Sequence, residues 1–468
     1  MSDSQTATLE RAERSEYHRI VWHLAWPAIA LNSLQSINTL VDRKFLDAIG
    51  PDALAASGGA FSIVFILFAL ALAIGTGATA LVSRFYGADE KMRLLKASRQ
   101  SVSLGIFAGT AFGLAAYWSA PLLTSMFLDT HTSAAAYRYS IQYLRPVALA
   151  MPAMFVFNVL ASCMRAVGDT RTPMYVSSIQ ILLHMGLNWL LMFPTRDVHL
   201  FGHVVRMPGM NMGAAGSGTA FCISAWIAAV MYFATSNRTV LGRTWNLQWP
   251  ENAWMRRILR IATPAAIQNL VRAVSMTVFM IALRLTPQGA EATGAMSMSL
   301  SLESMAFMPV FGYMIAAATL VGQSLGMRNP VRAERLAWSA THQGVGVMTV
   351  VGILLFVFAS PLAAVFVTDP EQRCLTMRYL QIVALSEPLF GYAMVLAGAH
   401  QGAGDTVRPG WVTVIANFGI RVPFALIFAV WMRLGTIAAW WALSLSSMAQ
   451  GVMMIVAFRQ GKWKEKQV

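Results

Sequence analysis

Charge is scarce in this sequence. Only 12% of its 468 residues are Asp, Glu, Lys or Arg, whereas an average soluble domain has about a quarter. Cysteine is scarcer still: there are three, with no Cys-x-x-Cys spacing, so neither a disulfide framework nor a zinc site is indicated. The motifs GxxxxGK[ST] and HExxH do not occur. We therefore expect no ATP-driven motor, no enzyme activity, no metal centre and no organic cofactor.

Hydrophobic residues are, by contrast, abundant. They make up 56% of the chain and gather in long blocks such as 53–82, 344–368 and 434–458. A helix needs about 20 apolar residues to cross the ~30 Å hydrocarbon core of a membrane. Dividing the blocks at polar or Gly/Pro segments gives twelve candidate spans, which start near residues 22, 55, 98, 138, 172, 214, 258, 292, 338, 376, 410 and 436. The sequence predicts an all-α membrane protein of about twelve transmembrane helices.

The positive charges alternate along the chain. Lys and Arg gather in segments 84–99, 238–260, 328–335 and 459–466, while the loops near Pro51, Leu128 and Gly289 are nearly free of them. Cytoplasmic loops are the ones enriched in Lys and Arg. The pattern predicts cytoplasmic N- and C-termini and an even number of spans. The net charge of +14 is thereby interpreted as a topology signal rather than as a nucleic-acid surface.

The two halves of the chain repeat each other. Matching positions lie 236 to 239 residues apart, and the clearest pairs are Pro27 and Pro264, Gly87 and Gly326, Tyr143 and Tyr379, and the Gly-Asp-Thr motifs at 168–170 and 404–406. Transporters built from parallel repeats bind substrate between the halves and rock them to alternate access. We expect a tail (1–21), an N-lobe (22–236), a linker (237–257), a C-lobe (258–457) and a second tail (458–468). The shared Gly-Asp-Thr motifs are interpreted as turns with capping side chains.

Residues that only one half possesses are the better candidates for function. Three carboxyl groups inside predicted spans have no counterpart in the other half: Asp42, Glu303 and Glu387. A carboxylate in a bilayer is costly and commonly belongs to an ion or proton pathway. Asp42 and Glu303 are predicted to couple transport to an ion, with Asn38, one turn before Asp42, sharing its site.

Structural roles are the alternative for each carboxyl group. Asp42 precedes Arg43 and Lys44 and would pair with one of them near the membrane surface. Glu303 belongs to a polar stripe in an apolar span. Glu387 precedes Pro388, where it would satisfy backbone groups freed by a kink.

Further polar residues predict a substrate cavity. His184 and Asn188 are four residues apart and share one helix face. Arg272 lies in the seventh span, where it either pairs with Glu303 or Glu387 or faces water. We assign His184, Asn188, Arg272 and Glu387 to the cavity. The 29 methionines and 25 phenylalanines are compatible with a lining that repacks around varied organic molecules.

Several segments together resemble exporters of the MATE (multidrug and toxic compound extrusion) family. They are 26–29 (WPAI), 40–42 (LVD), 46–50 (LDAIG), 165–170 (RAVGDT), 210–216 (MNMGAAG) and 401–406 (QGAGDT), and the resemblance extends over roughly residues 17–457. It implies two six-helix lobes around a central cleft. It also implies export of amphipathic or cationic organic solutes in exchange for H⁺ or Na⁺. The expected setting is a monomer in the bacterial inner membrane, with the lipid bilayer and small organic substrates as its partners.

The resemblance also implies roles for individual positions. Asp42 falls on the first-span aspartate implicated in coupling, which makes H⁺ or Na⁺ binding there the expectation, and Glu303 on a glutamate that several members carry. Asn188 stands where DinF-like members have a second aspartate, and His184 where they carry asparagine. The NorM-like branch has a seventh-span glutamate near Arg272 and a tenth-span aspartate near Phe390, and both are missing here. In its charged positions the chain is therefore nearer the DinF-like branch.

Two other functions remain open at this stage. A flippase for lipid-linked saccharides would share the fold but would need a cationic cleft, for which Arg145, Arg272 and Arg421 are available and against which the carboxylates argue. A non-transporting receptor or scaffold would show no ion flux when solute is added. Neutralising its intramembrane carboxyl groups would change only its stability.

Overall fold

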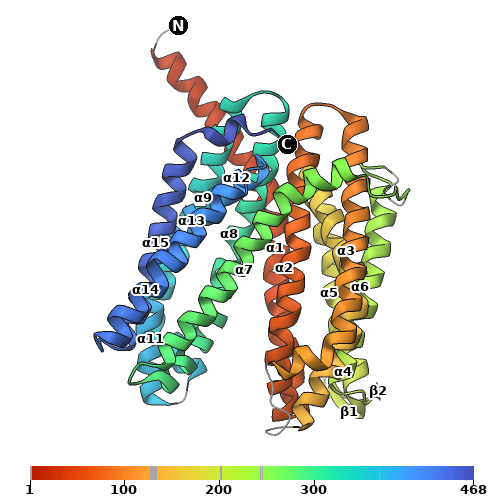
Figure 1. Ribbon diagram of the computed structural model, residues 1–468, viewed down its shortest axis with the longest axis vertical. Helices are drawn as coiled ribbons and strands as arrows, with labels where there is room; N and C mark the ends of the chain where they lie inside the picture. Colours follow the sequence, from red (N-terminus) through yellow and green to blue (C-terminus); the bar gives the residue numbers. More distant parts are fainter. Residues whose placement is uncertain are drawn as a thin grey trace.

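The computed structural model describes residues 3–126, 134–200, 203–242, 244, 246–367 and 369–467, so the loop around Leu128 lies outside the described residues. Two bundles of long helices stand side by side (Figure 1). Both chain termini lie toward one end of the molecule, and a small β-hairpin lies at the opposite end of the first bundle. The bundles correspond to the two halves of the sequence, and helix α7 crosses in front between them.

The first half contains α1 (Asp3–Ile49), α2 (Pro51–Gly87), α3 (Lys91–Ser125), α4 (Ala134–Ala166), α5 (Arg171–Met192), β1 (Pro194–Leu200), β2 (His203–Met210) and α6 (Ala214–Ser236). The second half contains α7 (Asn252–Arg284), α8 (Gly289–Gly326), α9 (Pro330–Val357), α10 (Ala359–Phe366), α11 (Pro370–Ala384), α12 (Glu387–Gly402), α13 (Val407–Val414), α14 (Val422–Phe424) and α15 (Thr436–Arg459). Two π-helical segments, η1 (Ile415–Arg421) and η2 (Ala425–Trp431), flank α14, and a short 3₁₀ helix, η3 (Lys462–Glu465), follows α15.

The prediction of about twelve membrane helices is confirmed. Ten helices in the described part of the chain are long and apolar enough to cross a membrane, and the α11–α12 pair, bent by 55°, adds one more. Helix α1 matches the remaining predicted span and is less apolar because it carries charged residues. The bend comes immediately before Glu387 and Pro388, where the sequence predicted a kink.

Proline and capping residues explain where several helices begin. Pro51, Pro330 and Pro370 each stand in the first turn of a helix, where the missing N–H costs no hydrogen bond. The Asn329 side chain accepts from the N–H of Arg332 at 2.9 Å, and Asp369 accepts from Gln372 at 2.8 Å. These caps fix the ends of the short loops that join the spans.

The repeated Gly-Asp-Thr motifs form turns, as the sequence predicted. Gly168 and Gly404 have φ values of +94° and +81°, a region that favours glycine. Asp169 accepts a hydrogen bond from the N–H of Thr172 at 3.0 Å at the start of α5. The second aspartate, Asp405, instead accepts from Arg408 at 2.7 Å.

The β-hairpin is a feature that the sequence analysis did not predict. Strands β1 and β2 pair antiparallel, with Arg196 opposite Met207 and Val198 opposite Val205. The polar composition of this segment hides the alternation that normally marks a strand.

Helix α1 contacts both halves of the molecule. Near its start, Val21 and Ala25 are fully buried in a core cluster shared with α8, α9 and α12. Near its end, Leu46 packs with Met192 and Phe193 beside α5. The first helix therefore belongs to neither bundle alone, and the predicted lobe boundary at residue 22 remains a prediction.

The two halves meet closely at the end that carries the termini. A Cβ atom on Gly87 would collide with the carbonyl oxygen of Gln323, and one on Gly326 with that of Arg84. The repeated glycines at the ends of α2 and α8 thus allow the two backbones to touch. Gln323 Nε2 also donates to the Ala166 carbonyl at 2.9 Å.

A C-terminal strap, defined here as residues 461–467, crosses this junction. Trp463 is fully buried and stacks on Phe458 with ring centroids 4.7 Å apart. Lys464 pairs with Glu334 of α9 at 2.6 Å. Arg84 of the first half donates to the carbonyl of Lys466 at 2.6 Å, so the strap contacts both halves.

Candidate functional site

A polar cluster lies between α1 and α5. Asn188 Nδ2 donates to Asp42 Oδ1 at 2.6 Å, and Asn38 Nδ2 donates to Asp42 Oδ2 at 3.3 Å. His184 Nδ1 lies 3.3 Å from Asn38 Oδ1 and 3.8 Å from Asp42 Oδ2. The structure therefore brings together four of the seven residues singled out from the sequence. We call Asn38, Asp42, His184 and Asn188 the N-lobe polar site.

Helical spacing explains this arrangement. Residues four apart lie on the same face of a helix, so Asn38 and Asp42 form one edge of the site and His184 and Asn188 the other. The two edges face each other because α1 packs directly against α5. What the sequence could not supply was the distance between helices that lie about 146 residues apart.

Burial differs within the N-lobe polar site. The His184 side chain is 4% exposed and Asn188 is fully buried, whereas the Asp42 side chain retains 25% exposure. Asn188 Oδ1 and His184 Nε2 are buried and have no hydrogen-bond partner among the described residues. The site therefore holds one accessible carboxylate beside an unused amide oxygen. Such a group of oxygens suits a proton or a small hard cation.

The predicted alternative, in which Asp42 pairs with Arg43 or Lys44, is wrong. No Lys or Arg nitrogen among the described residues comes within 4.0 Å of the Asp42 carboxylate. Both basic side chains are exposed and turn away, because residues one and two positions along a helix point to different faces.

Aromatic rings close the N-lobe polar site on the hairpin side. The Phe45 ring packs edge-on against Trp189 and Phe193, with centroids 5.9 Å and 5.6 Å away. The Arg196 guanidinium of β1 lies over Phe193 at 3.9 Å and over Trp189 at 4.6 Å. The hairpin thus anchors an aromatic layer next to Asn188. Sequence reasoning missed this layer because its members come from three separate elements.

The remaining ionisable candidates lie in the second half. Tyr379 Oη donates to Glu303 Oε2 at 2.8 Å, joining α11 to α8. Glu387 is 2% exposed, and its Oε2 has no hydrogen-bond partner among the described residues. Tyr379 was overlooked because its match to Tyr143 in the other half marked it as scaffold.

Arg272 does not form the ion pair that was one of its two predicted environments. No described carboxylate oxygen lies within 4.0 Å of its guanidinium, and its contact is with Met394 Sδ at 4.0 Å. Arg421, which the sequence raised only for the flippase, donates to Ser446 Oγ at 3.0 Å. We call Arg272, Glu303, Tyr379, Glu387 and Arg421 the C-lobe polar cluster.

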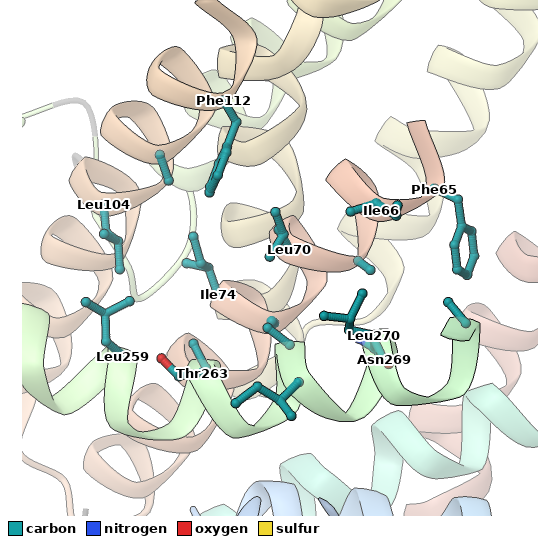
Figure 2. Close-up of a pocket in the computed structure, with 17 residues that line it drawn as sticks. Phe65, Ile66, Leu70, Ile74, Leu104, Phe112, Leu259, Thr263, Asn269 and Leu270 are labelled. Atoms are coloured by element: carbon teal, nitrogen blue, oxygen red, sulfur yellow. The ribbon is translucent and has the colours of Figure 1, made fainter. Parts of the chain in front are cut away.

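An apolar pocket opens between α7 and the first half of the chain. It has a volume of about 360 Å³ and is lined by α2, α3 and α7. Figure 2 shows Phe65, Leu70 and Ile74 of α2 facing Leu259 and Leu270 of α7 across it. The polar side chains at its wall are Thr263 and Asn269 of α7. The pocket therefore offers a surface for apolar groups and contains none of the ionisable candidates.

The duplicated helical bundle with polar groups inside its spans defines the class of protein as a membrane transporter built from parallel repeats. The family model MatE matches residues 27–190 and 264–427, once in each half. The chain belongs to the MATE family. Its members are transporters rather than enzymes.

The relatives cover nearly the whole chain. A probable multidrug resistance protein NorM of Thermotoga maritima is 26% identical over 463 residues, which are 98% of this chain and 96% of that protein. A probable multidrug resistance protein YoeA of Bacillus subtilis is 23% identical, covering 94% and 93%. Among solved structures, a MOP superfamily transporter of Pyrococcus furiosus matches with a TM-score of 0.85 at 18% identity, over 96% and 97% of the two chains. A MATE structure in complex with MaL6 gives 0.84 at 19% identity, over 95% and 96%. The structural likeness confirms the fold.

Proposed function

We propose that this chain is a secondary antiporter that exports amphipathic organic solutes in exchange for H⁺ bound at Asp42, with Na⁺ as the alternative coupling ion. The observation that supports this most directly is the N-lobe polar site. Asp42 is the one carboxylate there, it remains partly exposed, and amide groups of Asn38 and Asn188 hold it in place. Placing a carboxylate inside a membrane segment costs free energy, and a carboxylate retained there is suited to binding and releasing an ion.

The cycle follows from charge balance at this site. When Asp42 is ionised, its negative charge attracts the positive group of a bound solute. When an ion arrives from outside and neutralises the carboxylate, this attraction is lost and the solute leaves. Release of the ion on the other side restores the charge. Exchange is obligatory because one carboxylate serves the ion and the solute in turn.

Alternating access needs a junction that opens and closes. The crossing of α2 and α8 at Gly87 and Gly326, together with the C-terminal strap, supports a state closed at the end of the termini. By the distribution of Lys and Arg, we assign that end to the cytoplasm of a bacterial inner membrane. Rocking of the 22–236 and 258–457 lobes would part this junction and admit solute. Glu303, held by Tyr379, is the proposed second ion-binding group.

The test is efflux of a fluorescent organic dye from proteoliposomes, with a proton or a sodium gradient imposed separately. Wild type is compared with Asp42→Asn and with Asp47→Asn, a matched change at an exposed aspartate of the same helix. We expect efflux driven by the proton gradient in wild type and Asp47→Asn, and none in folded Asp42→Asn. Efflux driven by Na⁺ alone overturns the proton assignment. Failure of both gradients with several dyes favours the flippase or the scaffold.

A further inference from the structure

Two guanidinium groups in the C-lobe polar cluster lack an ionic partner. Arg272 of α7 contacts Met394 Sδ at 4.0 Å, and Arg421 at the end of η1 donates to Ser446 Oγ at 3.0 Å. Neither lies within 4.0 Å of a carboxylate oxygen among the described residues. A guanidinium has five N–H donors, so most of the donors of each side chain find no acceptor in the described protein.

Such groups are costly inside a membrane bundle. Arginine within a transmembrane segment almost always pairs with an acid or a backbone carbonyl, or faces an aqueous cavity. Both arginines are partly exposed, and none of their nitrogens is among the buried atoms without a partner. Their free N–H groups therefore reach accessible space rather than being sealed in the core. They are available to a ligand.

The internal repeat relates the positions of these two arginines to positions in the first half of the chain. Helix α7 repeats α1, and the α13–η1 segment repeats α5, which are the two elements that build the N-lobe polar site. By the offsets of the repeat, Arg272 corresponds to Gln35 and Arg421 to Met185, the latter directly beside His184. The same pair of elements thus carries an aspartate in one half and two arginines in the other. The elements match but the residues do not, because the counterpart of Asp42 in the second half is Phe279.

The backbone around Arg421 supports a binding role. Residues 415–421 form a π-helix, and a second one follows at 425–431. π-Helical segments are rare and occur frequently at functional sites. Asn417 of the same segment accepts from Ser275 of α7 at 3.3 Å, which fixes η1 against the helix that carries Arg272. Arg272 lies one turn before Ser275, and Arg421 lies one turn after Asn417, so both arginines lie within about one turn of this contact.

The acidic neighbours do not occupy this site. The close contact of Glu303 is the 2.8 Å hydrogen bond that it accepts from Tyr379. Glu387 Oε2 has no hydrogen-bond partner among the described residues, so it does not bind either arginine. No carboxylate oxygen of Glu303 or Glu387 lies within 4.0 Å of either guanidinium, so the free donors of Arg272 and Arg421 are available to an external anion.

We propose that Arg272 and Arg421 form a subsite for an anionic group, a carboxylate or another oxyanion, of the transported amphiphile. The inference rests on the proposed transport function and names its substrate class: solutes that bear an anionic group, as zwitterions or anions, rather than purely cationic drugs. In a zwitterion, the positive end would be attracted to ionised Asp42 and the negative end to the two arginines. The planar guanidinium matches an oxyanion with two parallel hydrogen bonds.

The test uses xanthene dyes that share one ring system. A rhodamine with a free carboxylate is compared with its ethyl ester, which lacks the anionic charge. Equilibrium binding to the purified full-length transporter is measured for both dyes in wild type, Arg272→Gln, Arg421→Gln and Arg284→Gln. Arg284 is an exposed arginine at the end of the same helix α7 and serves as the matched control. Arg272→Lys and Arg421→Lys keep the charge and are included in case the Gln variants fold poorly.

We expect wild type to bind the carboxylate dye at least about ten-fold more tightly than the ester, since one charge-assisted contact is worth a factor of this order. Each Gln variant should lose this preference while ester binding changes little, each Lys variant should retain part of it, and Arg284→Gln should match wild type. Equal binding of both dyes to wild type, or a preference that survives both Gln substitutions, overturns the subsite. Because binding is measured without a gradient, a protein that prefers the carboxylate dye but moves neither dye would contradict the antiport proposal and leave the subsite standing.

Discussion

The 2.6 Å hydrogen bond from Asn188 Nδ2 to Asp42 Oδ1 joins α5 to α1 at the only carboxylate of the N-lobe polar site. Asn188 is fully buried, whereas Asp42 keeps contact with accessible space. The amide therefore holds the carboxylate in one orientation while leaving one side of it open. This relationship explains how a flexible acidic side chain can be both accessible and fixed.

Replacing Asn188 by Ala tests that relationship. Because Asp42 would lose its shortest hydrogen bond, we expect the free energy of unfolding to fall by about 1–3 kcal/mol and gradient-driven efflux to fall with it. Leu182→Ala, an exposed truncation on the same helix, should change stability by less than about 0.5 kcal/mol. Thermal unfolding in detergent and dye efflux are the measurements. Full efflux in Asn188→Ala would show that the amide does not position the carboxylate.

The Glu303–Tyr379 hydrogen bond should show energetic coupling. Glu303→Gln and Tyr379→Phe each remove one side of the 2.8 Å contact, so we expect the double mutant to be less destabilised than the sum of the singles. A coupling energy of about 1–2 kcal/mol is expected for a hydrogen bond to a charged group. Additive effects in a double-mutant cycle would mean that the contact contributes nothing to stability.

The glycine crossing of α2 and α8 should not tolerate a methyl group. In Gly87→Ala or Gly326→Ala the new Cβ would meet a backbone carbonyl, which cannot move as a side chain can. We expect each variant to lose about 1–3 kcal/mol of stability or to part the junction between the halves. Gly346→Ala in α9, where a Cβ meets nothing within 4 Å, is the control and should gain about 0.5–1 kcal/mol. Equal melting temperatures for Gly87→Ala and Gly346→Ala would disprove the close crossing.

The C-terminal strap should depend on Trp463. Its ring is fully buried against Phe458, so Trp463→Ala should free the strap and expose Lys462 and Lys464 to trypsin. Limited proteolysis followed by mass measurement of the C-terminus reports this directly. Trp431→Ala, at a tryptophan that is 81% exposed, should leave the cleavage rate unchanged. A strap that stays protected in Trp463→Ala would show that its ion pairs suffice to hold it.

Acid should weaken the junction through Asp405, which lies in the turn between α12 and α13. Burial alone would raise the pKa of Asp405, but the hydrogen bond from His400 and the charges of His400, Arg408 and Lys466 outweigh it and lower the pKa below its ordinary value of 3.8. Because the pKa of Asp405 is lower in the folded protein than in the unfolded chain, its ionised carboxylate stabilises the fold at pH values above the unfolded-state pKa. This stabilisation is lost as the pH falls through the folded-state pKa.

Thermal unfolding measured from about pH 6 down to about pH 3 should therefore show a loss of stability at the acid end that Asp405→Asn lacks. Asp169→Asn changes the matching aspartate of the other half and should leave the acid-dependent loss in place. Identical pH profiles for wild type and Asp405→Asn would exclude this aspartate as the cause.

The sequence by itself determined the class of fold. Long uncharged blocks leave a membrane helix as the stable structure, and the duplicated motifs assign six spans to each half. Pro and Gly positions also indicated the bend before Pro388 and the turns at Gly168 and Gly404, because these residues restrict or free φ locally. Each of these features depends on interactions within a few residues of the chain.

Only the tertiary structure decided which polar residues meet. Asp42 and Asn188 are 146 residues apart and touch because α1 packs on α5, whereas Arg43 and Lys44, its immediate neighbours, point away. Tyr379 was set aside as repeated scaffold and proved to hold Glu303. Contacts of this kind depend on the distance and rotation between helices, which are set by side-chain packing over the whole bundle and leave no periodic trace in the sequence.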